Sequence, residues 1–199
     1  MDKEIRQMTM KPLLRSDEAG GGMVVEGYAA VFESPTVLYE SEYSGYQYLE
    51  QITRGAFDGA DMSRTVFKYN HGDNALVLAR TSNGSLKLEA DEHGLKVTAT
   101  LAETTAGRDL YTLIRGGYID KMSFAFTVDA TTTAQDDKAK RYLRSIDKIG
   151  TVYDVAAVDF PAYDDTEIEA RSGSADFFKR LDAKRIEDRK RRLKLLASL

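Results

Sequence analysis

The chain has 199 residues, of which 42% are hydrophobic and 30% charged, a composition typical of one soluble domain with a modest appendage. It contains no cysteine, which excludes disulfides, thiolate nucleophiles and cysteine metal sites. Its apolar runs are far shorter than the roughly 20 residues that cross a bilayer, so we expect no membrane partner. With only two histidines, the ligand set for a metal is poor, and we expect no cofactor.

The net charge of −4 is unevenly distributed along the chain. Residues 175–199 carry nine Lys or Arg against four Asp or Glu, and their composition is helical with a partial apolar stripe. This asymmetry predicts an appended basic helix rather than a nucleic-acid-binding domain, so no nucleic-acid partner is expected. The helix could bind an acidic surface of a protein partner, or it could simply be solvated.

Strand patterns dominate the chain in order. We expect strands over residues 23–32, 46–52, 64–70, 75–80, 85–90, 95–101, 122–128, 141–149 and 151–160, with a further edge strand within 5–14. The clearest hairpin joins 85–90 to 95–101, and a convincing helix spans 104–115, capped by Thr104 or Thr105 and ended by Gly116-Gly117. The polar segment 131–140 is expected to be a mobile loop.

Eight or nine short strands with one central helix predict a mainly β fold with helices (α+β). We expect a closed or nearly closed β-barrel with peripheral helices, because alternating βαβ units are absent. Residues 1–171 are expected to form this domain, and residues 172–199 a basic C-terminal helix or tail.

Two side chains stand out as candidates for chemistry. His71 follows an apolar strand at the point where it meets a loop, and histidine offers a base that titrates near pH 7. Ser123 lies inside an apolar strand, unlike most serines of the chain, which occupy turns or caps. By spacing alone, His71 could equally be an exposed residue at a strand end, and Ser123 a small residue filling a strand face. The second histidine, His93, lies in a hairpin turn, where a solvated ring is expected.

The chain resembles the tailed-bacteriophage prohead (capsid maturation) serine protease family in six fragments that occur in the same order: EGYAAVF, EQITRGAFD, YNHG, LKLEADEHGL, DLYTLIRGGYIDKMSFAF and DVAAVDFPAYDDT. The resemblance covers roughly residues 27–171. It implies a fold similar to that of herpesvirus assemblin, a β-barrel protease wrapped by helices. It also implies that His71 is the general base and Ser123 the nucleophile. In related sequences the histidine is often followed by Asp, whereas Gly72 follows it here.

The third catalytic residue must hold the His71 ring and favour the imidazolium that forms when Ser123 loses its proton. Glu89 is the first choice, because the strands just after the histidine strand are expected to pair with it. Asp91 is the second choice and Asp154 the third. Each of these acids could instead be a solvated carboxylate, and Glu89 could be the cross-strand partner of a lysine.

The resemblance implies a serine endopeptidase that cleaves a scaffold protein, or the scaffold part of the major capsid protein, within an assembling procapsid in the host cytoplasm. It also implies trimming of the chain itself, and self-association is left open. The competing hypothesis is a non-catalytic scaffold or capsid-assembly module on the same fold. That module would place His71 and Ser123 on different faces, with the Oγ atom well over about 4 Å from the ring.

Overall fold

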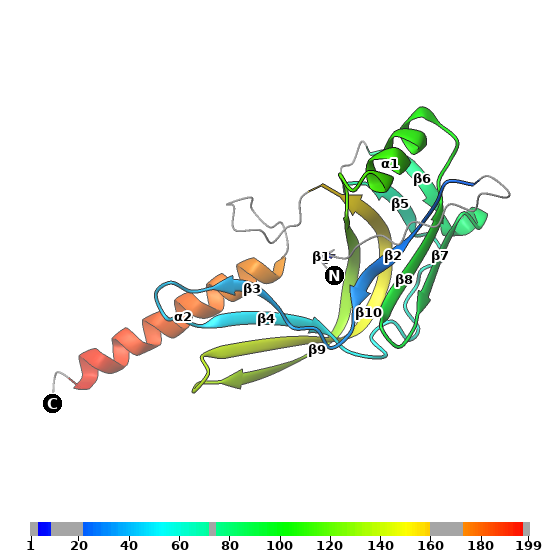
Figure 1. Cartoon of the computed structure of the whole chain (residues 1–199). Helices are drawn as coiled ribbons and strands as arrows, with labels where there is room; N and C mark the ends of the chain where they lie inside the picture. The colour runs from blue at the N-terminus through cyan, green and yellow to red at the C-terminus, as the bar shows by residue number, and fades with distance from the viewer. Residues whose placement is uncertain (1–3, 9–21, 72–74, 160–172, 197–199) are drawn as a thin grey trace.

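The computed structural model describes residues 4–8, 22–71, 75–159 and 173–196. These residues form two β-sheets and two α-helices (Figure 1). The larger sheet contains β1 (Glu4–Met8), β3 (Thr36–Glu40), β4 (Gln47–Ile52), β5 (Val66–Tyr69), β6 (Val77–Arg80), β9 (Lys121–Asp136) and β10 (Arg141–Val158). The smaller sheet contains β2 (Val24–Val31), β7 (Leu86–Ala90) and β8 (Gly94–Thr100). The helices are α1 (Thr105–Arg115) and α2 (Gly173–Leu196), and a 3-10 turn, η1, covers Thr81–Asn83.

Strand β10 organises the larger sheet. One of its edges pairs antiparallel with β9 along nearly its whole length. Its other edge pairs in parallel first with β4, over residues 141–146, and then with β5, over residues 154–157. The sheet therefore has two parts: a body around β5 and an arm around β4, which extends away from the body in Figure 1.

The hydrophobic core is formed in the body by residues of both sheets and α1. On β9, the side chains of Phe124 and Phe126 are fully buried and stack with their ring centroids 4.5 Å apart. Helix α1 contributes the buried side chains of Leu110 and Ile114. Thr104 caps the helix by accepting a hydrogen bond from the backbone N–H of Gly107, which confirms the expected helix start.

Helix α2 is held against the arm by a polar cluster. Asp182 is 3% exposed and accepts hydrogen bonds from the Ser44 hydroxyl (2.8 Å) and the Tyr48 hydroxyl (3.0 Å). The Arg185 guanidinium lies 3.9 Å from the ring centroid of Tyr46. Burial, together with the hydrogen bond to Asp182, raises the pKa of Tyr48 to about 12. The predicted C-terminal helix is therefore present, and a buried carboxylate fixes it to β4.

The mainly β fold with helices is confirmed, but the expected closed or nearly closed barrel is wrong. The described strands form two separate open sheets, and no strand ladder joins the smaller sheet to the larger one. The physical reason lies in the length of β9 and β10, which have 16 and 18 residues. Both continue beyond the core, and β4 and β5 share one edge of β10 in succession. The sheet therefore extends into an arm instead of closing on itself.

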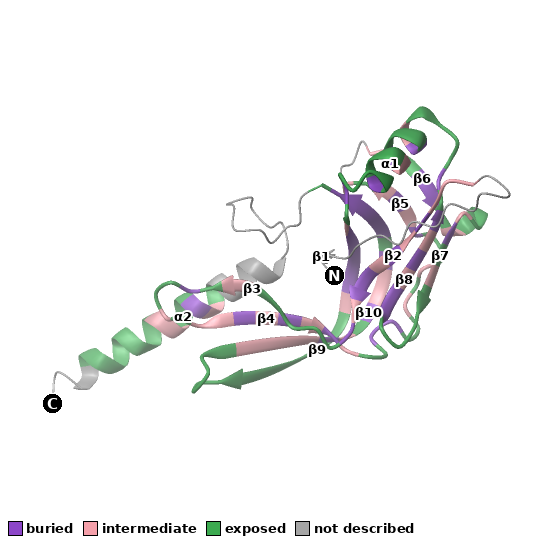
Figure 2. Ribbon diagram, in the orientation of Figure 1, coloured by how far each residue is buried: buried purple, intermediate pink, exposed green. Residues whose placement is uncertain are grey.

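The expected loop over residues 131–140 is also wrong. Strand β9 continues to Asp136 and β10 begins at Arg141, so only residues 137–140 turn. Three consecutive β-branched residues, Thr131 to Thr133, suit an extended strand and pair with residues 144–146 of β10. This part of β9 is exposed, whereas the segment around Ser123 is buried (Figure 2). The polar residues of 131–136 reflect the exposure of this part of β9 and do not indicate a loop.

Some expectations fall on residues outside the described ranges. The end of the last predicted strand at Phe160, the boundary between residues 171 and 172, and most of the possible edge strand beyond Met8 are among them. Within the described residues, neither helix is both long enough and apolar enough to span a bilayer.

Candidate active site

Ser123 lies in the part of β9 that crosses the body. Its neighbour two residues along the same face is Ala125, and Ala156 of β10 lies directly opposite it. Both alanines are 0% exposed, as is Ser123 itself. Because these neighbours are small, this face of the sheet has room for a ring beside the serine hydroxyl.

A β-bulge aligns an acid with this serine. Val152 of β10 lies opposite Phe126, but two residues later Asp154 lies opposite Ala125, so the register shifts by one residue between them. Since side chains alternate between the two faces of a strand, a one-residue shift exchanges the faces. The shift puts Asp154, which is 2% exposed, on the same face as Ser123 and directly opposite Ala125 of β9.

His71 reaches this face from the end of β5. The residue before it, Asn70, has a φ of 57°, in the left-handed region that asparagine tolerates better than most residues. The Asn70 N–H donates to the Ala157 carbonyl (2.9 Å), which fixes the turn on β10. The turned chain brings His71 Nε2 to 2.5 Å from Ser123 Oγ and His71 Nδ1 into hydrogen-bonding contact with Asp154 Oδ1.

The imidazole therefore bridges a hydroxyl and a carboxylate. An ionised carboxylate only accepts hydrogen bonds, so Nδ1–H donates to Asp154 and Nε2 is left to accept from the Ser123 hydroxyl. The side chain of His71 is 11% exposed and that of Asp154 is 3% exposed, so the bridge lies largely away from water. This arrangement can remove a proton from the serine and stabilise the resulting imidazolium.

The other two candidate acids lie elsewhere. Glu89 is exposed on β7 of the smaller sheet, in register with Lys96 of β8, as the cross-strand alternative anticipated. Asp91 is exposed in the β7–β8 turn, where it accepts hydrogen bonds from the Tyr28 hydroxyl (2.7 Å) and from the backbone N–H of His93 (2.7 Å). The hydrogen bond from Tyr28 is the main reason that the pKa of Asp91 is lowered. Of the three acids, Asp154 is the one whose carboxylate contacts the His71 ring.

Sequence reasoning ranked Asp154 last and did not consider Asn70. The sequence did contain a signal for Asp154, because it is a single acid between Val152-Tyr153 and the apolar run Val155 to Val158. Ser123 is likewise a single hydroxyl among the apolar residues that flank it. An isolated polar residue that a strand buries requires a partner. The role of Asn70 depends on a backbone angle and has no comparable pattern in the sequence.

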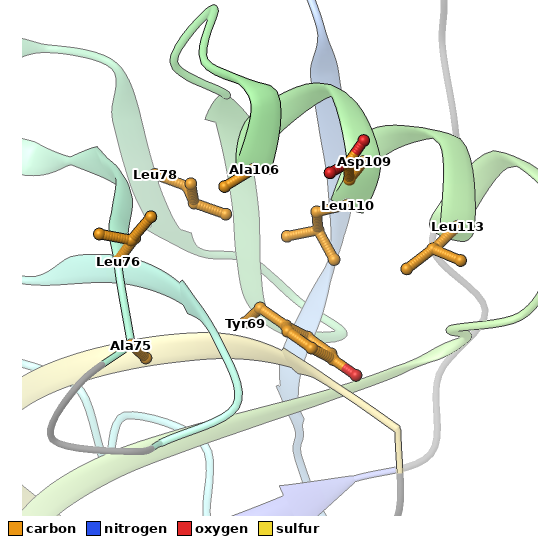
Figure 3. A pocket seen from close by; sticks show the side chains of 8 residues that line it. All are labelled: Tyr69, Ala75, Leu76, Leu78, Ala106, Asp109, Leu110 and Leu113. Carbon is orange, nitrogen blue, oxygen red and sulfur yellow. The ribbon is translucent and has the colours of Figure 1, made fainter.

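A pocket of about 310 Å³ opens between α1 and the strands β5 and β6 (Figure 3). Its lining is mainly aliphatic, with Leu76, Leu110 and Leu113 around the ring of Tyr69. Ala156 of β10 lies opposite Ser123 on one side and opposite Lys68 of β5 on the other, so Lys68 is on the same face as Ser123, and Tyr69 is the next residue along β5. Alternation along β5 therefore puts Tyr69 on the opposite face of the sheet from Ser123, and the pocket is not part of the serine site.

Residues 11–180 match the sequence model of the caudovirus prohead serine protease family. The chain belongs to this family. His71, Ser123 and Asp154 all lie within the matched segment, whereas β1 precedes it. No curated protein and no solved structure matches the chain, so the fold similarity to herpesvirus assemblin stays a prediction. Membership of the prohead protease family supports a capsid maturation protease in general.

Proposed function

We propose that this prohead protease family member is a serine endopeptidase with Ser123 as nucleophile, His71 as general base and Asp154, in place of Glu89, as the residue that orients the histidine. The observation that carries the proposal is the His71 ring, which contacts the Ser123 hydroxyl through Nε2 and the Asp154 carboxylate through Nδ1. The competing non-catalytic module would require a Ser–His separation well over about 4 Å, and the separation is 2.5 Å.

The reaction proceeds in two halves. Ser123 Oγ attacks the scissile carbonyl carbon while its proton passes to His71 Nε2, and Asp154 stabilises the imidazolium. The C–N bond then breaks, the leaving amine takes the proton from Nε2, and an ester joins the acyl group to Oγ. Water attacks this ester with His71 again accepting the proton, which returns to Oγ as the acid product leaves.

The substrate is a scaffold protein, or the scaffold part of the major capsid protein, inside the procapsid of the host cell. Support comes from family membership, since a prohead protease acts on the proteins of an assembling head. We also propose that the chain trims itself beyond residue 171. The exposed basic residues of α2, such as Lys184, Arg189 and Arg192, offer an attractive surface for an acidic scaffold.

The test is mass spectrometry of the capsid and scaffold proteins after co-expression with the chain. Ser123→Ala and His71→Ala are each expected to abolish cleavage, by a factor of roughly 10³ or more, while the protein stays folded. The matched control is Ser82→Ala, at an exposed serine of η1, which should cleave as the wild type does. Cleavage near the wild-type rate by Ser123→Ala would end the assignment of the nucleophile.

A further inference from the structure

The strand that carries Ser123 has a neighbour on each side. On one side lies β10, with Ala156 opposite Ser123. On the other side lies β1, which pairs antiparallel with β9 so that Gln7 is opposite Ser123 and Met8 is opposite Met122. β1 has five residues, ends the larger sheet, and lies ahead of residues 11–180 that match the family. The two neighbours of the nucleophile strand therefore differ greatly in how firmly they are held.

β10 cannot leave this position without loss of the core. Its residues 154–158 are buried, and Asp154 on the same strand forms part of the active site. β1, in contrast, is paired with a strand on one edge only in the described part of the chain. Short edge strands open at a much lower free energy than the core they flank. The β1 edge is thus the side from which β9 can be uncovered.

An endopeptidase must also admit a polypeptide. An extended peptide binds most simply by adding a strand to an exposed sheet edge, where main-chain hydrogen bonds hold it. Its scissile carbonyl must come to within about 3–3.5 Å of the nucleophile. Ser123 has no exposed surface in this structure, and the edge beside it is paired with β1. As it stands, the site is closed to a substrate.

We propose that β1 is an intramolecular occupant of the edge of β9 that an extended peptide substrate uses, and that β1 leaves this edge before cleavage. The inference rests on the proposed function, because it takes Ser123 as the nucleophile. The chain thus carries its own stand-in for a substrate strand, and release of β1 converts a closed protease into an open one.

The test measures access to Ser123 with diisopropyl fluorophosphate, which requires no knowledge of the natural substrate. Ser123 Oγ bonds to phosphorus, fluoride leaves, and His71 takes the hydroxyl proton. The full-length variant Ile5→Pro/Arg6→Pro disrupts β1, since successive N–H groups of a strand point to opposite edges and one of the two must face β9. Its control is Ile5→Ala/Arg6→Ala, which keeps both N–H groups.

We expect the proline variant to be labelled at Ser123 at least about tenfold faster than the alanine control, from the loss of a ladder hydrogen bond and the disruption of the strand. Equal labelling rates in the two folded variants would overturn the role of β1 and leave the serine protease assignment intact. Failure of the wild type and of both variants to react at Ser123 would overturn the proposed function, and this inference with it.

A reversible lock covers the case in which the proline variant does not fold. Ile5 and Ala125 are register partners, and the chain has no other cysteines, so Ile5→Cys/Ala125→Cys can form a single disulfide. The oxidised form should be labelled at least about tenfold more slowly than the reduced form of the same variant. Labelling that does not change on reduction would overturn the proposal.

Discussion

Replacement of Asp154 by asparagine tests the acid of the site most directly. Asparagine has nearly the same shape, so packing around this 2% exposed residue is retained while its charge is lost. An amide that donates to His71 Nδ1 would shift the ring proton to Nε2, and the Ser123 hydroxyl would then have no acceptor. An amide that accepts from Nδ1 would keep the tautomer but lose the charge-assisted hydrogen bond, which typically contributes about 1.5–3 kcal/mol of stabilisation.

The two effects together predict a 10³–10⁴-fold loss of kcat/KM for Asp154→Asn, or about 4–5.5 kcal/mol of transition-state stabilisation. The assay is cleavage of the co-purified scaffold, with the rate of Ser123 labelling by diisopropyl fluorophosphate as a second measurement. Glu89→Gln is the matched control and should stay within about twofold of the wild type, because Glu89 is exposed beside Lys96. A loss below about tenfold in folded Asp154→Asn, or an equal loss in Glu89→Gln, would refute the assignment of the acid.

Three further outcomes follow from the backbone and from the arm. Asn70→Gly should keep kcat/KM within a few-fold of the wild type. Asn70→Val should lower kcat/KM about tenfold or more on the same substrate, because a β-branched residue resists a φ of 57°. Equal kinetics for the two variants would contradict the positioning role of Asn70. The fold favours neutral Tyr48, so its contribution to stability is present below pH 10 and is lost as pH rises towards 12. Chemical denaturation should show a fall of up to about 2–3 kcal/mol over that range, and Tyr48→Phe should remove this part of the dependence. Gly94→Ala would bring a Cβ to 1.9 Å from the Ala30 carbonyl oxygen, and should lower the free energy of unfolding by about 2–4 kcal/mol in the same assay; a loss below about 0.5 kcal/mol would mean that the strands separate freely there.

The site could be predicted in part because two of its residues stand out from their surroundings. His71 is one of only two histidines, and Ser123 interrupts an apolar strand. Their pairing still came from the resemblance, since spacing alone left both with ordinary structural roles. The contact of Asp154 with His71 could not be foreseen, because the position of Asp154 depends on a one-residue shift between β10 and β9, and alternation of residue types does not reveal such a shift.

The sequence predicted most of the individual strands and the helix of the body correctly, but the predicted closure of the strands into a barrel is wrong. Hydrophobic alternation located the strands of the body and the helix over 105–115, because those segments bury one or both faces. The arm buries much less, so residues 131–136 of β9 looked like a loop. Because the arm was not predicted, many short strands suggested a barrel. Three of those predicted strands, 122–128, 141–149 and 151–160, are parts of the two long strands β9 and β10, which extend beyond the body.

The bulge in β10 also has a consequence for how this protein can vary in length. Residues 137–140 form the exposed turn between β9 and β10, where an inserted or deleted residue would change the turn and its contacts with residues 44–47 but not the serine site. One residue removed between Asp154 and Ala157 would instead bring Asp154 opposite Phe124 and turn its carboxylate to the opposite face from Ser123. We therefore expect natural variants to differ freely at the β9–β10 turn and to keep the same number of residues between the bulge and the end of β10.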